Sequence, residues 1–145
     1  MNLKEFETII KKSWSSETSS PSWRENWNKE NPSAGQCAIT ALLVNDYFGG
    51  EIMRCMTSMG SHYYNRIDGE IVDFTVEQFG NEIPDYNSGE PRSRDYLLSS
   101  PDTKQRYELL KNNFEKLMDG HKLANQLLDE NEKFDFSTTS SDIER

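Results

Sequence analysis

Residues 32–43, PSAGQCAITALL, join a turn to an apolar segment, and a cysteine stands at the junction. The turn contains proline, serine and glycine, whereas residues 37–48 are apolar almost without interruption. Two glycines follow at positions 49 and 50, and glycine after the last apolar residue is a common end of a helix. This pattern predicts a central helix over residues 37–48 that is buried on nearly all sides.

The segments on either side predict a helix, a loop and strands. Residues 3–14 carry apolar side chains at helical spacing, which indicates an amphipathic helix. Residues 15–36 are rich in Ser, Asn and Pro and lack periodicity, so we expect a long loop, and loops of this length are often functional. Residues 51–57 are typical of a strand, and residues 61–75 contain two β-type runs around an Asp-Gly turn at 68–69, which predicts a hairpin.

The C-terminal part of the chain is predicted to be mainly helical. Residues 80–95 are polar and contain two prolines and two glycines, which indicates a surface loop. Ser100 is placed to cap a helix that begins at Pro101 and buries one apolar stripe. Gly120 is expected to stop or kink this helix, with a further short helix after it.

The order of these elements predicts an α+β fold, in which a central helix packs on a small antiparallel β-sheet with flanking helices. The length of 145 residues suits one domain. We expect this domain to cover residues 1–136. The last nine residues, STTSSDIER, offer almost nothing to bury, so we expect residues 137–145 to be a disordered tail.

Composition and charge exclude several function classes. The formal net charge is −9, which disfavours nucleic acid as a partner, because phosphate binding depends on clustered Lys and Arg. We find no apolar run near the roughly 20 residues of a membrane span and no secretory signal. The two cysteines do not make a disulfide framework, so we expect a cytoplasmic protein with reduced thiols. No glycine-rich phosphate loop and no paired metal-ligand spacing occur, so we expect neither cofactor nor metal.

The Asp-Gly turn fixes the geometry of the predicted hairpin. In a two-residue turn the flanking residues 67 and 70 face each other, so Tyr64 is expected opposite Asp73 and His62 opposite Thr75. Side chains alternate along a strand, and His62, Tyr64 and Asp73 therefore share one face. His62 and Asp73 are diagonal neighbours there, with Cβ atoms about 6–8 Å apart, and their side chains are long enough to form a hydrogen bond.

This arrangement predicts a catalytic triad. A carboxylate that holds an imidazole fixes its tautomer and stabilises the imidazolium. A helix N-terminus and a nearby imidazolium favour the thiolate form of a cysteine, so Cys37 is the candidate nucleophile. The alternative is structural, since free cysteines are among the most buried residues, and Cys55, inside an apolar strand, is interpreted in that way.

Three sequence blocks also resemble known families. GQC before an apolar helix, followed by SHYYNR and EIVDFT, is similar to the transglutaminase-like and papain-like cysteine superfamily. The resemblance implies that Gly35, Gln36 and Cys37 begin the central helix and that His62 and Asp73 complete the triad. NPSAGQCAITALLVNDYFGGEI, GSHYYNRIDGEIVDFT and RSRDYLLSSPDTKQRYELL resemble more closely the YunG-like family of small bacterial proteins, over residues 20–112.

The predicted function is therefore cysteine-dependent acyl transfer on a protein or a small amide or ester, most simply hydrolysis as by an amidase or peptidase. Cys37 attacks the carbonyl, His62 moves the proton and Asp73 orients His62. The Cys37 N–H and Gln36 are expected to hold the oxyanion. The aromatic residues expected to bind substrate are Trp23, Trp27 and Tyr64.

Two other functions stay open at this point. The first is a catalytically inactive interaction module that keeps the fold and binds a protein partner through loop 15–36. The second is an effector that uses the same triad on a single target protein. The acidic composition favours a cationic or neutral substrate.

Overall fold

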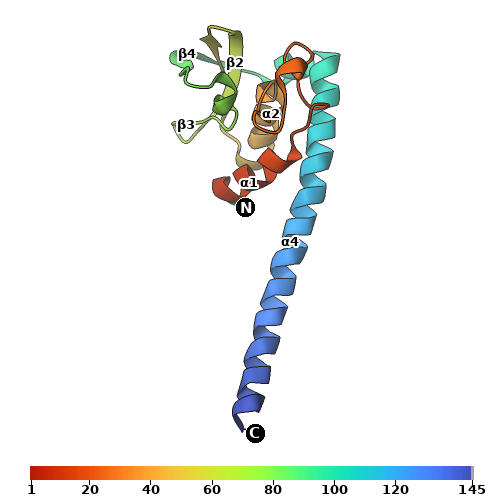
Figure 1. The fold of residues 1–145 in the computed structure, drawn as a ribbon. Helices are drawn as coiled ribbons and strands as arrows, with labels where there is room; N and C mark the ends of the chain where they lie inside the picture. The colour runs from red at the N-terminus through yellow and green to blue at the C-terminus, as the bar shows by residue number, and fades with distance from the viewer. Residues whose placement is uncertain (145) are drawn as a thin grey trace.

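The computed structural model describes the backbone of residues 1–144 and the side chains of residues 1–131 (Figure 1). The fold is α+β, as predicted, with a small antiparallel sheet and helices. The elements, in chain order, are α1 (Leu3–Ser13), the 3-10 turn η1 (Arg24–Asn26), α2 (Cys37–Phe48), β1 (Glu51–Thr57), β2 (Gly60–Ile67), β3 (Glu70–Val72), the 3-10 turn η2 (Val76–Phe79), β4 (Asp85–Arg92), α3 (Arg94–Leu98) and α4 (Pro101–Glu144).

Helix α2 is the central layer of the fold. The four antiparallel strands, in the order β3-β2-β1-β4, lie on one side of it, and α1 and α4 lie on the other (Figure 1). The helix begins at Cys37 and ends at Phe48, which are the predicted bounds. Its middle residues, from Ile39 to Val44, are all buried, so the prediction of a buried central helix is confirmed.

Phe6 joins the layers in the main hydrophobic core. This residue of α1 contacts Phe114 of α4 with ring centroids 4.8 Å apart. It also contacts Tyr47 and Phe48 at the end of α2, and Phe74 in the segment after β3. The start of α1 is capped as its sequence indicates, because the Asn2 side chain accepts a hydrogen bond from the Glu5 N–H at 2.8 Å.

The β2–β3 hairpin has the predicted register but is shorter than expected. Ile67 pairs with Glu70 and Asn65 with Val72 across the two-residue turn. Both turn residues have positive φ, 51° for Asp68 and 80° for Gly69, as the favoured hairpin turn requires. The β2–β3 ladder ends at the pair of Asn65 and Val72.

The predicted pairs of Tyr64 with Asp73 and of His62 with Thr75 are therefore wrong. Strand β3 stops at Val72, and the chain turns into η2 instead of continuing along β2. Asp73 and Thr75 lie beyond the ladder, where the Asp73 carboxylate accepts a hydrogen bond from the Thr75 N–H at 3.3 Å. This local turn of the backbone replaces the expected strand hydrogen bonds.

The prediction of a surface loop over residues 80–95 is also wrong, because the middle half of this segment, Asp85–Arg92, forms strand β4. It pairs with β1, with a register irregularity between Arg54 and Met56. Pro91 and Gly89 disfavour a strand in sequence, but β4 is an edge strand, where proline is tolerated. Pairing with the free edge of β1 decides the structure of this segment.

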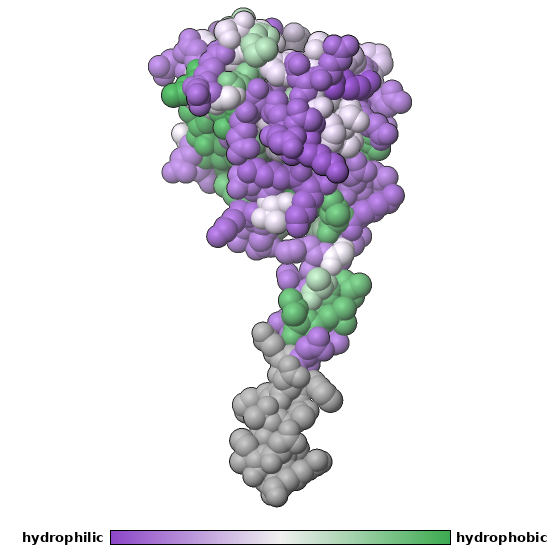
Figure 2. Space-filling model, viewed as in Figure 1, coloured by the Kyte–Doolittle hydropathy of each residue, from purple (hydrophilic) through white to green (hydrophobic). Residues whose placement is uncertain are grey.

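Helix α4 begins as predicted and extends much farther than predicted. The Ser100 hydroxyl accepts a hydrogen bond from the Thr103 N–H at 3.3 Å, and Pro101 is the first helical residue. Gly120 neither ends nor divides the helix, because the intrahelical hydrogen bonds continue on both sides. Exposed leucines gather on the part that projects from the body, where they give a hydrophobic surface (Figure 2): Leu123, Leu127 and Leu128.

We expected one domain over residues 1–136 and a disordered tail over residues 137–145. The side chains on both sides of this boundary lie outside the described residues, so the division stays a prediction. Within the described part of the chain, no helix combines the length and apolar character that crossing a bilayer requires.

The two halves of α4 should differ in their contribution to stability. Leu110 is 0% exposed against α1 and α2, whereas Leu123 is 57% exposed on the projecting half. We expect Leu110→Ala to lower the free energy of unfolding by about 2–5 kcal/mol, and Leu123→Ala to change it by no more than about 0.5 kcal/mol. Urea denaturation of the two variants measures both values, and equal effects would contradict this packing.

Candidate active site

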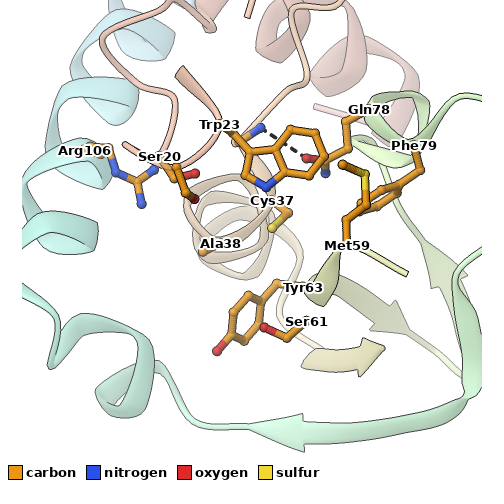
Figure 3. A pocket seen from close by; sticks show the side chains of 12 residues that line it. Ser20, Trp23, Cys37, Ala38, Met59, Ser61, Tyr63, Gln78, Phe79 and Arg106 are labelled. Carbon is orange, nitrogen blue, oxygen red and sulfur yellow. Dashed lines mark hydrogen bonds between the residues drawn. The ribbon is translucent and has the colours of Figure 1, made fainter. Parts of the chain in front are cut away.

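Cys37 stands at the N-terminus of α2 and faces a cavity of about 250 Å³. Its side chain is partly exposed and lies in the middle of the cavity lining (Figure 3). Backbone N–H groups in the first turn of a helix have no intrahelical acceptor, so they can donate to a ligand there. The cysteine is therefore accessible and stands at the positive end of the helix dipole.

Gly35 allows loop 15–36 to close over this end of the helix. Its φ is +72°, and a Cβ at this position would meet Ser19 Oγ at 2.4 Å and Trp23 Cβ at 2.8 Å. The Gly35 carbonyl accepts a hydrogen bond from the Ser20 N–H at 3.0 Å. Its own N–H donates to Gln78 Oε1 at 3.1 Å. The turn before Cys37 is thus held between the loop and η2.

His62 and Asp73 form the predicted contact. His62 Nε2 lies 2.6 Å from Asp73 Oδ2, and the His62 side chain is 0% exposed. The same carboxylate oxygen accepts a hydrogen bond from the Tyr86 hydroxyl at 2.7 Å. The other oxygen accepts from the Thr75 N–H at 3.3 Å. These partners hold the carboxylate in one orientation, which in turn orients the imidazole.

The surroundings of His62 favour its protonated form. Burial alone would lower its pKa, but hydrogen bonding to Asp73 and to Cys37 outweighs burial and raises the pKa from 6.5 to about 9. Nδ1 is buried and makes no hydrogen bond of regular geometry within the described part of the chain. Because Nε2 is taken by Asp73, Nδ1 is the nitrogen that remains for Cys37.

Aromatic rings enclose the imidazole. Phe79 meets the ring of His62 edge-on with centroids 4.7 Å apart, and Tyr64 stacks on it at 6.1 Å. Tyr64 is buried beside Met53 and Cys55 and does not line the cavity. Burial raises the pKa of the Cys55 thiol to about 11, in agreement with its interpretation as a packing residue.

Of the remaining predicted site residues, some line the cavity and others do not. Trp23 lines the cavity next to Cys37 (Figure 3). Trp27 does not, and its indole N–H donates to the Pro32 carbonyl at 3.0 Å within the loop. Gln36 is buried and lies outside the cavity lining, with its amide nitrogen donating to the Ser15 carbonyl at 3.0 Å. No group of three or more His, Cys, Asp or Glu is arranged to hold a metal ion among the described side chains.

Sequence reasoning missed three residues at this site: Gln78, Tyr86 and Arg106. Gln78 is buried in the cavity wall, and its Nε2 has no hydrogen-bond partner within the described part of the chain. Tyr86 reaches Asp73 from β4. Arg106 reaches the cavity from α4. Each comes from a segment distant in sequence from Cys37, and no motif marks any of them.

Comparison with known proteins identifies the family. The family model described as YunG protein matches residues 2–119. The chain belongs to the YunG family. It is 38% identical to the protein named "Uncharacterized protein YunG" of Bacillus subtilis (strain 168) over 110 residues, which are 76% of this chain and 89% of that protein. No solved structure matches the chain. The family match contains every residue of the site and ends just before Gly120.

Gly35 offers a direct test of how the loop is held. Gly35→Ala introduces both backbone strain and overlap, whereas Gly49→Ala introduces strain alone, because a Cβ at Gly49 meets nothing within 4 Å. We expect about 1–3 kcal/mol of destabilisation from the positive φ in either variant and about 1–3 kcal/mol more from overlap at Gly35. Thermal or urea unfolding compares them, and equal losses would show that the loop does not pack on Gly35.

The raised pKa of His62 predicts a pH-dependent stability. The folded state binds this proton more tightly than the unfolded state, so the stabilisation is complete below pH 6.5 and disappears as the pH rises through about 9. Between pH 6 and pH 10, the free energy of unfolding of wild type should fall by on the order of 3 kcal/mol more than that of His62→Gln. Urea denaturation at both pH values measures this difference. His121→Gln is the matched control at the other histidine, and its free energy of unfolding should change with pH as that of wild type does. A difference between wild type and His62→Gln that is the same at pH 6 and pH 10 would contradict the raised pKa of His62.

Proposed function

We propose that this protein is a cysteine-dependent acyl-transfer enzyme with Cys37, His62 and Asp73 as its catalytic triad. One observation carries the proposal: a completely buried His62 is bound to Asp73 through Nε2, its Nδ1 has no hydrogen-bond partner among the described residues, and Cys37, which helps to raise the pKa of His62, opens to a cavity. A buried ion pair is costly to desolvate, so its position behind an accessible cysteine suggests catalysis more than stability.

The proposed reaction has two steps. The Cys37 thiolate attacks the carbonyl carbon of an amide, ester or thioester, and a C–S bond forms as electrons move onto the carbonyl oxygen. When the tetrahedral intermediate collapses, the bond to the leaving group breaks, and His62 gives its proton to that group. A water molecule then attacks the thioester, His62 takes a proton from it, and Cys37 leaves as thiolate with the acid as product.

Two donors are proposed to stabilise the oxyanion. The backbone N–H of Cys37 lies in the first turn of α2, where helix geometry leaves it without an internal acceptor. Gln78 Nε2 is the second donor. The Gly35 N–H donates to Gln78 Oε1, so the amide oxygen of Gln78 faces Gly35 and its NH₂ group faces away, without a hydrogen-bond partner among the described residues. The amide of Gln36, engaged with Ser15, is less well placed.

The proposal includes a relation to transglutaminase-like and papain-like enzymes. Its support is the chain order Cys, His, Asp and the placement of the cysteine at the start of a central helix beside an antiparallel sheet. It also includes a reducing compartment such as the cytoplasm, because Cys37 and Cys55 are both free thiols and the mechanism requires the first to stay free.

Alkylation of the native protein tests the triad. We expect iodoacetamide to label Cys37 at pH 6 roughly 30-fold faster than a free thiol, of which only about 0.3% is ionised at that pH. His62→Ala should remove most of this advantage, because the imidazolium partner of the thiolate is lost. Intact-mass measurement follows the reaction.

The Cys55→Ser variant serves as the control for labelling at the other cysteine and should react like wild type. Labelling that requires denaturation, or that begins only above about pH 8.5, would show that Cys37 is a packing residue. The acyl-transfer proposal would then be abandoned.

A further inference from the structure

The cavity at Cys37 has a charge opposite to that of the whole protein. The chain has 25 Asp and Glu residues against 16 Lys and Arg, and its net charge is −9. Among the described residues that line the cavity, none carries a carboxylate, Arg106 is the single cationic side chain, and the proposed Cys37 thiolate is balanced by the imidazolium of His62. The positive end of the α2 dipole lies at the same cavity. A substrate inside it therefore meets positive potential.

Arg106 is held rigidly at the cavity wall. The residue is only 7% exposed. Its Nε donates to Asp102 Oδ2 at 2.8 Å, and Nη1 donates to the Thr18 carbonyl at 3.0 Å. A guanidinium has five N–H donors, so these contacts leave donors free, and Nη2 makes no hydrogen bond within the described part of the chain. Arg106 already forms an ion pair with Asp102, and its spare donors at the cavity can bind a second anionic group.

We propose that Arg106 forms an anion subsite in this cavity and that the substrate is an acyl compound carrying a carboxylate. This inference rests on the proposed function, because it names the substrate class of the same site. A carboxylate matches the planar donors of a guanidinium. A phosphate dianion fits less well, because Asp102 already offsets part of the charge of the only cation in the described cavity lining.

The positions of the side chains define how such a substrate would lie. Figure 3 shows Arg106 and Ser20 on one side of Cys37, and Gln78, Phe79 and Met59 on the other. With the reacting carbonyl at Cys37, the carboxylate points to Arg106, and the side near Gln78 receives the oxyanion. The net charge of the chain favours cationic substrates, but the local charge of the cavity favours an anionic one.

A purely structural role is the alternative for Arg106, since its bond to Thr18 ties loop 15–36 to α4. Arg24 is a matched control for that role. It donates through Nε to the Ser16 carbonyl at 3.0 Å and through Nη2 to the Ser19 carbonyl at 2.9 Å. Arg24 thus also braces the loop with one positive charge, but it does not line the cavity.

The test compares two alkylating reagents of similar size, anionic iodoacetate and neutral iodoacetamide. In both reactions the Cys37 sulfur forms a bond to carbon and iodide leaves, so the ratio of the two rate constants cancels any change in the thiolate fraction. We expect the iodoacetate-to-iodoacetamide ratio for wild type to exceed that of glutathione. Arg106→Gln should lower the ratio about tenfold, the factor that corresponds to about 1.4 kcal/mol.

Arg24→Gln should leave the ratio within about twofold of wild type, because only a screened, distant charge is lost. Arg106→Lys should restore part of the ratio. If Arg106→Gln does not fold, Ser20→Asp tests the same point, because a carboxylate beside Arg106 competes with the reagent and should lower the ratio. A ratio that stays unchanged in Arg106→Gln, or in Ser20→Asp when that variant is used, would overturn the subsite.

A second measurement does not depend on a reactive cysteine. Succinate should raise the unfolding temperature of Cys37→Ser more than succinamide at equal ionic strength, and Arg106→Gln added to this variant should remove the difference. If Cys37 is unreactive but succinate still binds, the triad fails and the subsite stands. If Arg106→Gln changes neither the ratio of alkylation rates nor the stabilisation by succinate, the anion subsite is ruled out while the proposed triad is not. A larger effect of inorganic phosphate than of succinate would overturn the carboxylate assignment.

Discussion

The fold depends on burying α2 on nearly all sides. A helix with so few polar positions cannot rest on a single partner, so the sheet must cover one face while α1 and α4 cover the other. Phe6 completes this arrangement by contacting α2, α4 and the segment after β3. Only the ends of α2 remain near the surface, and one of those ends is Cys37.

The imidazole is buried on the other face of β2. Tyr63 and Ile67 of β2 pack against the core around α2, whereas His62 alternates to the face of Tyr64, where Phe79 also covers it and removes it from water. A buried charge is tolerated only where hydrogen bonds and an opposite charge replace the lost hydration. Asp73 provides the charge, and Tyr86 and Thr75 occupy the remaining acceptor positions of its carboxylate. The polar network is thus continuous from Tyr86 on β4 to His62 on β2.

Net charge and local charge act differently in this protein. Surface carboxylates are hydrated, and salt screens them beyond a Debye length of about 8 Å. A cavity lined by Arg106 and by the first turn of α2 is little affected by distant surface charge. The overall acidity is the basis of the prediction that nucleic acid is not a partner, because binding its backbone needs an extended basic surface, and this stays a prediction. The net charge of the chain therefore does not indicate the charge of a ligand that binds in one cavity.

The sequence by itself determined the features that depend on neighbours along the chain. The bounds of α2, the start of α4 at Pro101 and the register of the 67–70 hairpin follow from apolar periodicity, capping and turn conformation, all of which act within a few residues. It also placed His62 within reach of Asp73, although the strand ends at Val72, three residues earlier than expected. Only the tertiary structure decided that 85–92 is a strand, and that Gln78, Tyr86 and Arg106 meet at one site, because contacts between distant segments have no local pattern.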